Sequence, residues 1–142
     1  MKDGVGKQLF KMMNKGHVWL YRTTNGRFGT MGGTVLLLTT RGAKSGHPRT
    51  NPLMGVAHDD GWLVAASAGG APRHPAWYHN VVANPAVTVE RGSEELPMNA
   101  RVAGPEERPA LWAKIVEFDT RFAGYETKVD REIPVVILEP KD

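Results

Sequence analysis

Tight turns join neighbouring strand-like segments of this chain, and they restrict its possible folds more than any other feature. The turns His58-Asp59-Asp60-Gly61 and Gly92-Ser93 each lie between two apolar stretches, an arrangement typical of β-hairpins. Strands joined by such short turns pair antiparallel, because a parallel pair needs a crossover of a dozen or more residues. A doubly wound parallel sheet is therefore disfavoured.

The apolar and alternating segments predict six short strands and a few helices. The strands are expected over 34–40, 50–57, 62–67, 86–91, 96–102 and 133–138, and the helices over 5–22, 75–84 and 105–118. The first strand is apolar enough to be buried on both faces, whereas Pro52 restricts the second to a sheet edge or a bulge. We expect a mainly β (α+β) fold, a small antiparallel barrel with peripheral helices, because closure removes sheet edges.

Composition excludes several classes of protein and of site. The 142 residues fit one domain, and the absence of cysteine excludes disulfides and thiolate sites. The five histidines show no metal-ligand spacing, so no metal site is predicted, and no nucleophile elbow, P-loop or dinucleotide fingerprint is found. Without a signal peptide or a ~20-residue apolar run, the expected location is the cytoplasm. An enzyme of this kind would most economically use an organic cofactor.

The net charge of +3 conceals an asymmetry between two parts of the chain. Residues 1–49 carry nine Lys/Arg and one acidic residue, for a charge of +8, and the rest carries −5. Such a basic pole indicates an anionic partner: a phosphate-bearing cofactor, nucleic acid or an anionic membrane. The basic helix expected over 5–22 fits either a membrane surface or a helix packed on the domain with its lysines in water. The aromatic and basic motif of RNA-binding domains is absent.

The segment from Thr40 to Pro52 holds the densest group of cations. Arg41, Lys44 and Arg49 fall within nine residues, and Gly42 and Gly46 let the backbone turn close to a ligand. Amides, hydroxyls and cations in one turn suit the binding of a phosphate or another anion. The alternative is a solvated basic hairpin loop.

Two further stretches could complete a cofactor site. The small residues of 65–70 would let a flat ring lie against the chain, and Trp77 and Asn80 follow on the next helix. Core packing is the alternative role for Trp77 and Tyr78, and capping of its own turn is the alternative for the Ser67 hydroxyl.

The chain resembles a known family over nearly its whole length. The runs 35–53, 74–80 with Asn84-Pro85, and 131–135 resemble, in the same order, the nitroreductase family of deazaflavin-dependent oxidoreductases of actinobacteria; residues 18–22 are similar to that family's N-terminal segment. The resemblance implies one split β-barrel domain over 1–142, six-stranded, antiparallel and FMN-binding-like, with 1–33 forming the basic helix and a glycine-rich loop. It also implies coenzyme F420, an 8-hydroxy-5-deazaflavin with a phosphate and an anionic oligoglutamyl tail.

Site residues follow from the same resemblance. It implies that Lys44 and Arg49 hold the phosphate, with the amides of Ala43 and Ser45 nearby. The rest of the cofactor would be lined by Asn51, Pro52, Ala65, Ala66, Ser67, Ala68, Ala76, Trp77 and Asn80. Ser67 and Tyr125 would face the substrate or relay a proton.

The resemblance predicts an F420H2-dependent reductase that transfers a hydride to a quinone, enone, unsaturated lactone or nitro compound. A non-catalytic F420- or FMN-binding carrier of the same fold is the alternative. Relative to nitro-activating members, Tyr125 stands without its companion tyrosines, since Phe122 and Met54 occupy two of the aligned positions; this argues against activation of bulky nitroimidazole prodrugs. The expected partners are a small-molecule acceptor and, for residues 5–22, the inner face of the plasma membrane, with the chain a monomer or homodimer.

Overall fold

The computed structural model describes residues 35–141 of the chain. The helix expected over 5–22 and the glycine-rich loop that follows it lie outside the described residues.

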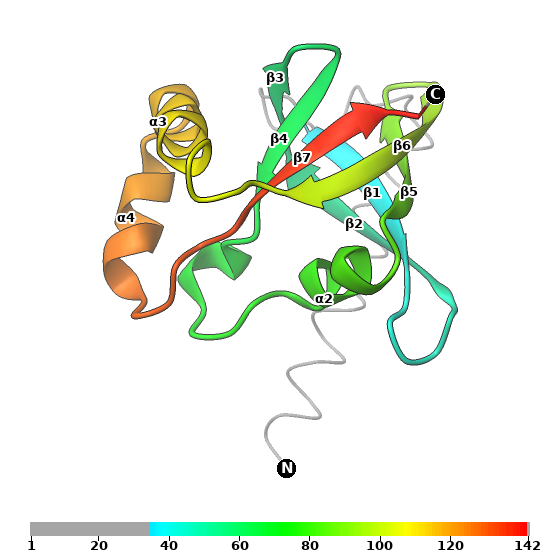
Figure 1. Ribbon diagram of the computed structural model, residues 1–142, viewed down its shortest axis with the longest axis horizontal. Coiled ribbons are helices and arrows are strands. Elements are labelled where there is room, and N and C mark those ends of the chain that lie inside the picture. Colours follow the sequence, from blue (N-terminus) through cyan, green and yellow to red (C-terminus); the bar gives the residue numbers. More distant parts are fainter. Residues whose placement is uncertain (1–34, 142) are drawn as a thin grey trace.

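The described chain is a curled sheet flanked by helices (Figure 1). Its strands are β1 (Val35–Arg41), β2 (Pro48–Met54), β3 (Val56–His58), β4 (Gly61–Ala65), β5 (Ala86–Arg91), β6 (Glu94–Val102) and β7 (Val135–Pro140). Its helices are the 3-10 helix η1 (Ala68–Gly70) and the α-helices α2 (Ala76–Ala83), α3 (Arg108–Phe118) and α4 (Arg121–Lys128).

The strand order is β2-β1-β5-β6-β7-β4-β3, and every neighbouring pair is antiparallel. The hairpins close where the turns predict, with His58 opposite Gly61 and Arg91 opposite Glu94. The two edge strands, β2 and β3, are consecutive in the chain and separated only by Gly55. The sheet therefore curls until its edges meet in one bent segment. The predicted mainly β, antiparallel architecture with peripheral helices is confirmed.

The predicted count of six strands is wrong, because the strand expected over 50–57 is divided at Gly55. A Cβ at this position would overlap the side chain of Leu36 and lie 3.4 Å from the ring of Trp62. The backbone can bend this closely over the sheet interior only where there is no side chain. Pro52 lies in β2, at the edge of the sheet, as its missing N–H predicts.

The segment after α3, where neither a helix nor a strand was predicted, forms helix α4. Its first turn is held by Asp119, whose Oδ1 accepts the backbone N–H of Arg121 at 3.0 Å. The buried ring of Phe122 meets Trp112 edge-on at 6.4 Å and Tyr125 at 5.5 Å. Burial of aromatic side chains three residues apart on one face stabilises this short helix. The last strand begins at Val135, two residues later than predicted.

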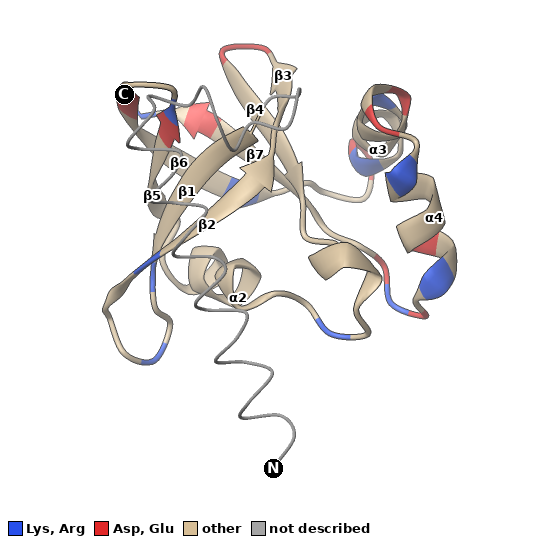
Figure 2. Cartoon of the chain, turned by 180° about the vertical axis from the view of Figure 1, so that it is seen from behind, with Lys and Arg blue, Asp and Glu red and all other residues tan. Residues whose placement is uncertain are grey.

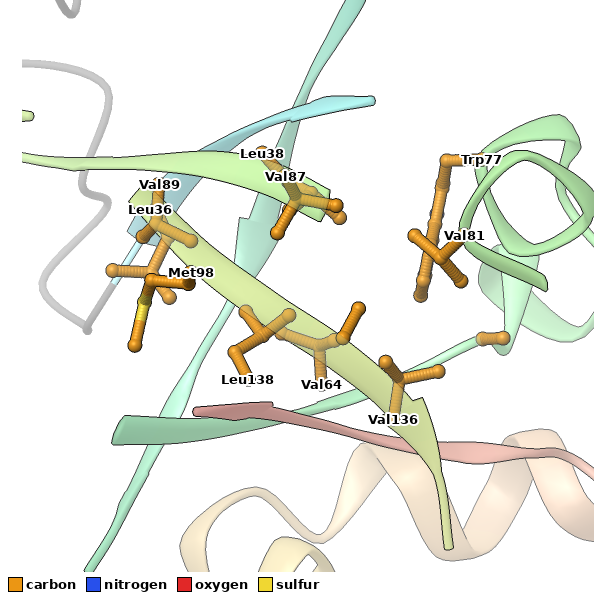
Figure 3. Close-up of a cluster of buried hydrophobic side chains, with 12 residues drawn as sticks. Leu36, Leu38, Val64, Trp77, Val81, Val87, Val89, Met98, Val136 and Leu138 are labelled. Atoms are coloured by element: carbon orange, nitrogen blue, oxygen red, sulfur yellow. The ribbon is translucent and has the colours of Figure 1, made fainter. Parts of the chain in front are cut away.

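The core has two main parts, one on each side of the sheet. Leu36, Leu38, Val64, Trp77 and Val81 belong to the cluster inside the curl, where α2 faces the strands (Figure 3). A second cluster lies under α3 and α4 and contains Leu63, Ile115, Phe122, Ile133 and Ile137. The full burial of residues 36–38 confirms that β1 is covered on both faces. Packing of α2 through Trp77 and Val81 fixes this helix beside the loop that joins β1 to β2.

Candidate functional site

The loop between β1 and β2 is a basic surface without a carboxylate. Arg41, Lys44 and Arg49 are exposed, and Figure 2 shows basic but no acidic residues on the loop. Within residues 35–141, none of the three cations forms an ion pair. Their charge is therefore available to an anion. We call residues 41–49 the basic loop.

Hydrogen bonds within the basic loop fix its shape. The N–H of Gly42 donates to the carbonyl of His47 at 2.8 Å, and the N–H of Gly46 donates back to Gly42 at 2.9 Å. Gly46 has a φ of 74°, which a residue with a side chain rarely adopts. Ser45 Oγ accepts the N–H of His47 at 3.1 Å. The loop is thus pre-organised, which lowers the entropy lost when it binds a ligand.

Asn80 joins the basic loop to helix α2. Its Oδ1 accepts the backbone N–H of Ala43 at 2.9 Å, and its Nδ2 donates to Thr40 Oγ1 at 3.0 Å. Asn80 is 7% exposed and Thr40 is 2% exposed, so the loss of either partner would leave a buried polar group unsatisfied. Asn80 was predicted as a cofactor contact. In the structure it anchors the basic loop, because its side chain binds the backbone amide of Ala43.

Helix η1 and its flanking residues, 65–71, form the other part of the predicted site, and we call them the strand-end segment. The N–H of Ala66 donates to the carbonyl of Pro134 at 2.9 Å and continues the pairing of β4 with the segment before β7. Beyond Ser67, three consecutive residues have positive φ: Ala68 at 50°, Gly69 at 63° and Gly70 at 85°. The chain turns sharply out of the sheet here, and the left-handed conformation of Ala68 costs roughly 1–2 kcal/mol.

The two predicted catalytic residues flank this turn. A Cβ at Gly70 would lie 3.5 Å from Cδ1 of Tyr125, so helix α4 places the phenol ring against the strand-end segment. Ser67 is 7% exposed, and its hydroxyl makes no capping hydrogen bond to η1, contrary to the alternative role considered for it. The proximity of Tyr125 to the strand-end segment is a property of the fold that its sequence position alone does not reveal.

Exposure separates the predicted lining residues into two groups. Ala68 and Ala76 are exposed, and Asn51, Pro52 and Ala65 are partly exposed. Trp77 is 4% exposed and points into the core (Figure 3), which is the alternative role considered for it, and Ala66 is fully buried. A ligand would meet the first group directly, and the second group supports the surface from behind.

A polar cluster behind the strand-end segment is absent from the sequence predictions. The guanidinium of Arg131 donates to the carbonyls of Ala66 (3.1 Å), Ser67 (2.9 Å) and Ala71 (3.2 Å), and to Nδ1 of His74 (2.9 Å). These partners lie 57 to 65 residues away in the chain, and three are backbone carbonyls that no motif can mark. The one signal in the sequence that marked Arg131 is its place in the run 131–135, which resembles the deazaflavin-dependent family.

Arg131 and His74 also line a pocket of about 300 Å³, together with Tyr78, Val102, Arg108 and Pro134. Burial, followed by the positive charges of Arg131 and His79, lowers the pKa of His74. Neutral His74 can accept the hydrogen bond from Arg131, whereas protonated His74 cannot.

Residues 35–141 contain no cluster of three or more side chains that could hold a metal ion. None of the helices in that range is both long and apolar enough to cross a membrane.

A family profile, a curated relative and a solved structure similar to this chain are each described as F420H2-dependent reductases. The sequence profile of the family described as F420H(2)-dependent quinone reductase matches residues 13–140. An F420H(2)-dependent quinone reductase of Mycobacterium tuberculosis is 39% identical over 140 residues, which cover 94% of this chain and 91% of the relative. A solved structure described as an F420-H2 dependent reductase is 48% identical, with a TM-score of 0.69, over 75% of this chain and 94% of its own. Another, described as a domain-swapped dimer, is 41% identical, with a TM-score of 0.71, over 97% and 98% of the two chains.

Proposed function

This chain belongs to the F420H(2)-dependent quinone reductase family, and we propose that its cofactor lies along β2, from the basic loop to the strand-end segment. The protein is an F420-dependent oxidoreductase that passes a hydride to an electron-poor acceptor. When bound, reduced F420 supplies this hydride from C5 of its deazaflavin ring. The chain must therefore bind the cofactor, orient its ring and the acceptor, and manage the accompanying proton.

Lys44 and Arg49 are the proposed phosphate ligands. Both are exposed on a loop whose shape is fixed by its own hydrogen bonds, and neither is neutralised by a carboxylate within residues 35–141. Charge-assisted hydrogen bonds from such cations to a phosphate contribute about 1.5–3 kcal/mol each. The cationic loop, which has no carboxylate partner within residues 35–141, is the observation that carries the proposal.

The proposed ring surface is made of small side chains. Ala65, Ala68 and Ala76 leave the backbone accessible to a flat heterocycle, and Asn51 and Pro52 of β2 lie between them and the basic loop in the chain. Ser67 and Tyr125 would lie on the substrate side of the cofactor ring and face the acceptor. The phenol of Tyr125 can donate a hydrogen bond to the acceptor oxygen that gains negative charge, or pass on a proton.

The acceptor class follows from the same chemistry. A quinone that receives a hydride on oxygen or ring carbon needs one proton to become a hydroquinone, and Tyr125 or solvent can supply it. Enones, unsaturated lactones and nitro compounds are further acceptors of the same electronic kind, and a nitroreductase activity is proposed on the sequence resemblance alone.

A stopped-flow assay tests this function directly. Reduced F420 bound to the purified protein is mixed with menadione, and the return of the oxidised cofactor's absorbance is followed. We expect reoxidation at a rate that rises with protein concentration and saturates with menadione. A rate equal to that without protein, with F420 demonstrably bound, would support the carrier alternative instead.

Residues 5–22 are the basis of a further proposed property, contact with an anionic membrane surface. The spaced lysines of residues 5–22 predict salt-sensitive binding to anionic vesicles, roughly 1 kcal/mol per cation near the surface. Co-sedimentation with vesicles at low and high salt checks this.

The domain-swapped dimer formed by a relative makes a homodimer the proposed assembly. Light scattering after gel filtration would distinguish it from a monomer.

A further inference from the structure

The strand-end segment contains one residue, Ala68, in a backbone conformation that its side chain disfavours. Ala68, Gly69 and Gly70 all have positive φ, and Ala68 has a Cβ, which makes this conformation unfavourable. Residues in such conformations persist only where surrounding contacts fix them. The contacts that fix this segment are therefore part of the site.

Arg131 provides contacts on both sides of the turn. Its Nη1 and Nη2 donate to the carbonyls of Ala66 and Ser67, before the turn, and its Nε donates to Ala71, after the turn. Nη1 also donates to His74, so that Arg131 is bonded to the segment that leads into α2 as well. The rigid planar fork of a guanidinium suits several acceptors held in fixed directions, whereas the single ammonium of a lysine does not.

We propose that Arg131 is a positioning residue for hydride transfer, which holds the strand-end segment in the shape that receives the cofactor ring. This inference rests on the proposed function, because it assumes that the ring lies against residues 65–68. Its effect falls on the rate, since a displacement of about 1 Å between reacting groups can cost a hundredfold. The affinity for F420 depends mainly on the basic loop, which Arg131 does not contact.

Arg108 offers a matched control in the same pocket. Its Nε and Nη2 donate to the carbonyl of Ile133 at 3.1 and 2.7 Å, and its guanidinium lies 5.1 Å from the centre of the Trp112 ring. Like Arg131, it is a part-buried arginine bonded to backbone, but it has no bond to the strand-end segment. Loss of Arg108 therefore reports the general cost of removing an arginine from this pocket.

The test compares the parent with Arg131→Ala, Arg131→Lys and Arg108→Ala. For each, F420 affinity is measured by fluorescence titration, kcat and KM with menadione by stopped flow, and the folded fraction by circular dichroism. We expect Arg131→Ala to lower kcat by about tenfold to a hundredfold with F420 affinity changed less than about threefold. Arg131→Lys should remain at least fivefold below the parent, and Arg108→Ala should stay within about twofold of it.

Chemical rescue separates positioning from loss of stability. The side chain removed in Arg131→Ala borders the pocket of about 300 Å³, so added methylguanidinium can reach the vacated position. We expect it to restore part of the kcat of Arg131→Ala and to leave Arg108→Ala unchanged. Should Arg131→Ala not fold, the Arg131→Lys variant decides the matter by its kcat.

Three results would overturn the inference. One is a folded Arg131 variant with the parent's kcat. Another is a loss of kcat that equals the unfolded fraction in both Arg131→Ala and Arg108→Ala. The third is a parent that neither binds F420 nor turns over, which would overturn the proposed function as well. The first two leave the proposed function intact.

Discussion

The basic loop is held from behind by a neutral side chain, whereas the strand-end segment is held by a charged one. Asn80 accepts a hydrogen bond from Ala43 in the loop and donates one to Thr40, just before the loop. Arg131 binds the segment through three hydrogen bonds donated to carbonyls. A neutral anchor leaves the three cations of the loop to act on a ligand. The charge of Arg131 is instead directed at backbone oxygens. The two regions therefore suit different tasks, attraction of an anion and control of shape.

This difference predicts that damage to each region has a different kinetic signature. Changes in the basic loop should weaken cofactor binding with little effect on the rate of the bound complex. Changes beside the strand-end segment should lower the rate with little effect on binding.

The double variant Lys44→Ala/Arg49→Ala should weaken F420 binding by about 3 kcal/mol or more, roughly a hundredfold, because two charge-assisted hydrogen bonds are lost. Fluorescence titration measures it, and the rate at saturating F420 should stay near that of the parent. Removal of two exposed cations outside the loop, Arg91→Ala/Lys141→Ala, should change affinity only slightly. Equal losses in the two double variants would reduce the loop's role to general electrostatic attraction.

Tyr125→Phe should have the opposite signature. It keeps the ring that packs on Gly70 and Phe122 and removes only the hydroxyl, so F420 affinity should barely change. The rate of reoxidation by menadione should fall about tenfold to a hundredfold, or ~1.4–2.7 kcal/mol. A variant as fast as the parent would leave Tyr125 as a packing residue and solvent as the proton source.

Asn80→Ala should act on the basic loop through its anchor. It leaves the buried Thr40 hydroxyl and the Ala43 amide without their partner, which should lower the free energy of unfolding by about 1–3 kcal/mol. F420 affinity should fall as the loop loses its fixed shape, and the rate of the bound complex should not. Asn84→Ala, at the C-terminal cap of the same helix and with one long contact to Arg41, is the control and should cost less than half as much.

Lowering the pH should loosen the anchor of the strand-end segment through His74. Its pKa is lowered in the folded protein, mainly by burial and then by the charges of Arg131 and His79, while its ring also lies against Tyr78 at 4.6 Å. As the pH falls below the ordinary value of 6.5, the unfolded chain binds a proton first, so the free energy of unfolding decreases until the folded pKa is passed. Above pH 6.5 the stability that depends on neutral His74 is fully present.

Urea unfolding across this pH range measures the effect. His74→Gln keeps an acceptor for Arg131 but does not titrate, so it should remove this part of the pH dependence. Identical pH profiles for the variant and the parent would show that His74 does not control the anchor.

Much of the fold was predictable because local signals carry it. Turn residues such as Gly61 and Gly92 specified the hairpins, and the apolar run of residues 35–38 specified a strand covered on both faces. The division at Gly55 was missed because the reason for it, contact with Leu36 and Trp62, arises only when the sheet curls. Helix α4 was missed because Gly124 weakens the helical signal of a segment that tertiary packing of Phe122 stabilises.

The candidate site was predictable only in part. The cations of the basic loop are adjacent in sequence, and their spacing alone indicates an anion site. The anchors are different, because Asn80 and Arg131 bind partners about 40 and 60 residues away in the chain. A sequence pattern marks such a residue as polar, but only the fold shows what it holds.

The most direct test of the basic loop as an F420 site is a binding titration of the parent protein with F420, FMN, FAD and NADPH under identical conditions. We expect F420 to bind most tightly and added salt to weaken its binding, because the basic loop binds its anionic end. FMN binding as tight as or tighter than that of F420, or F420 binding that salt leaves unchanged, would contradict it.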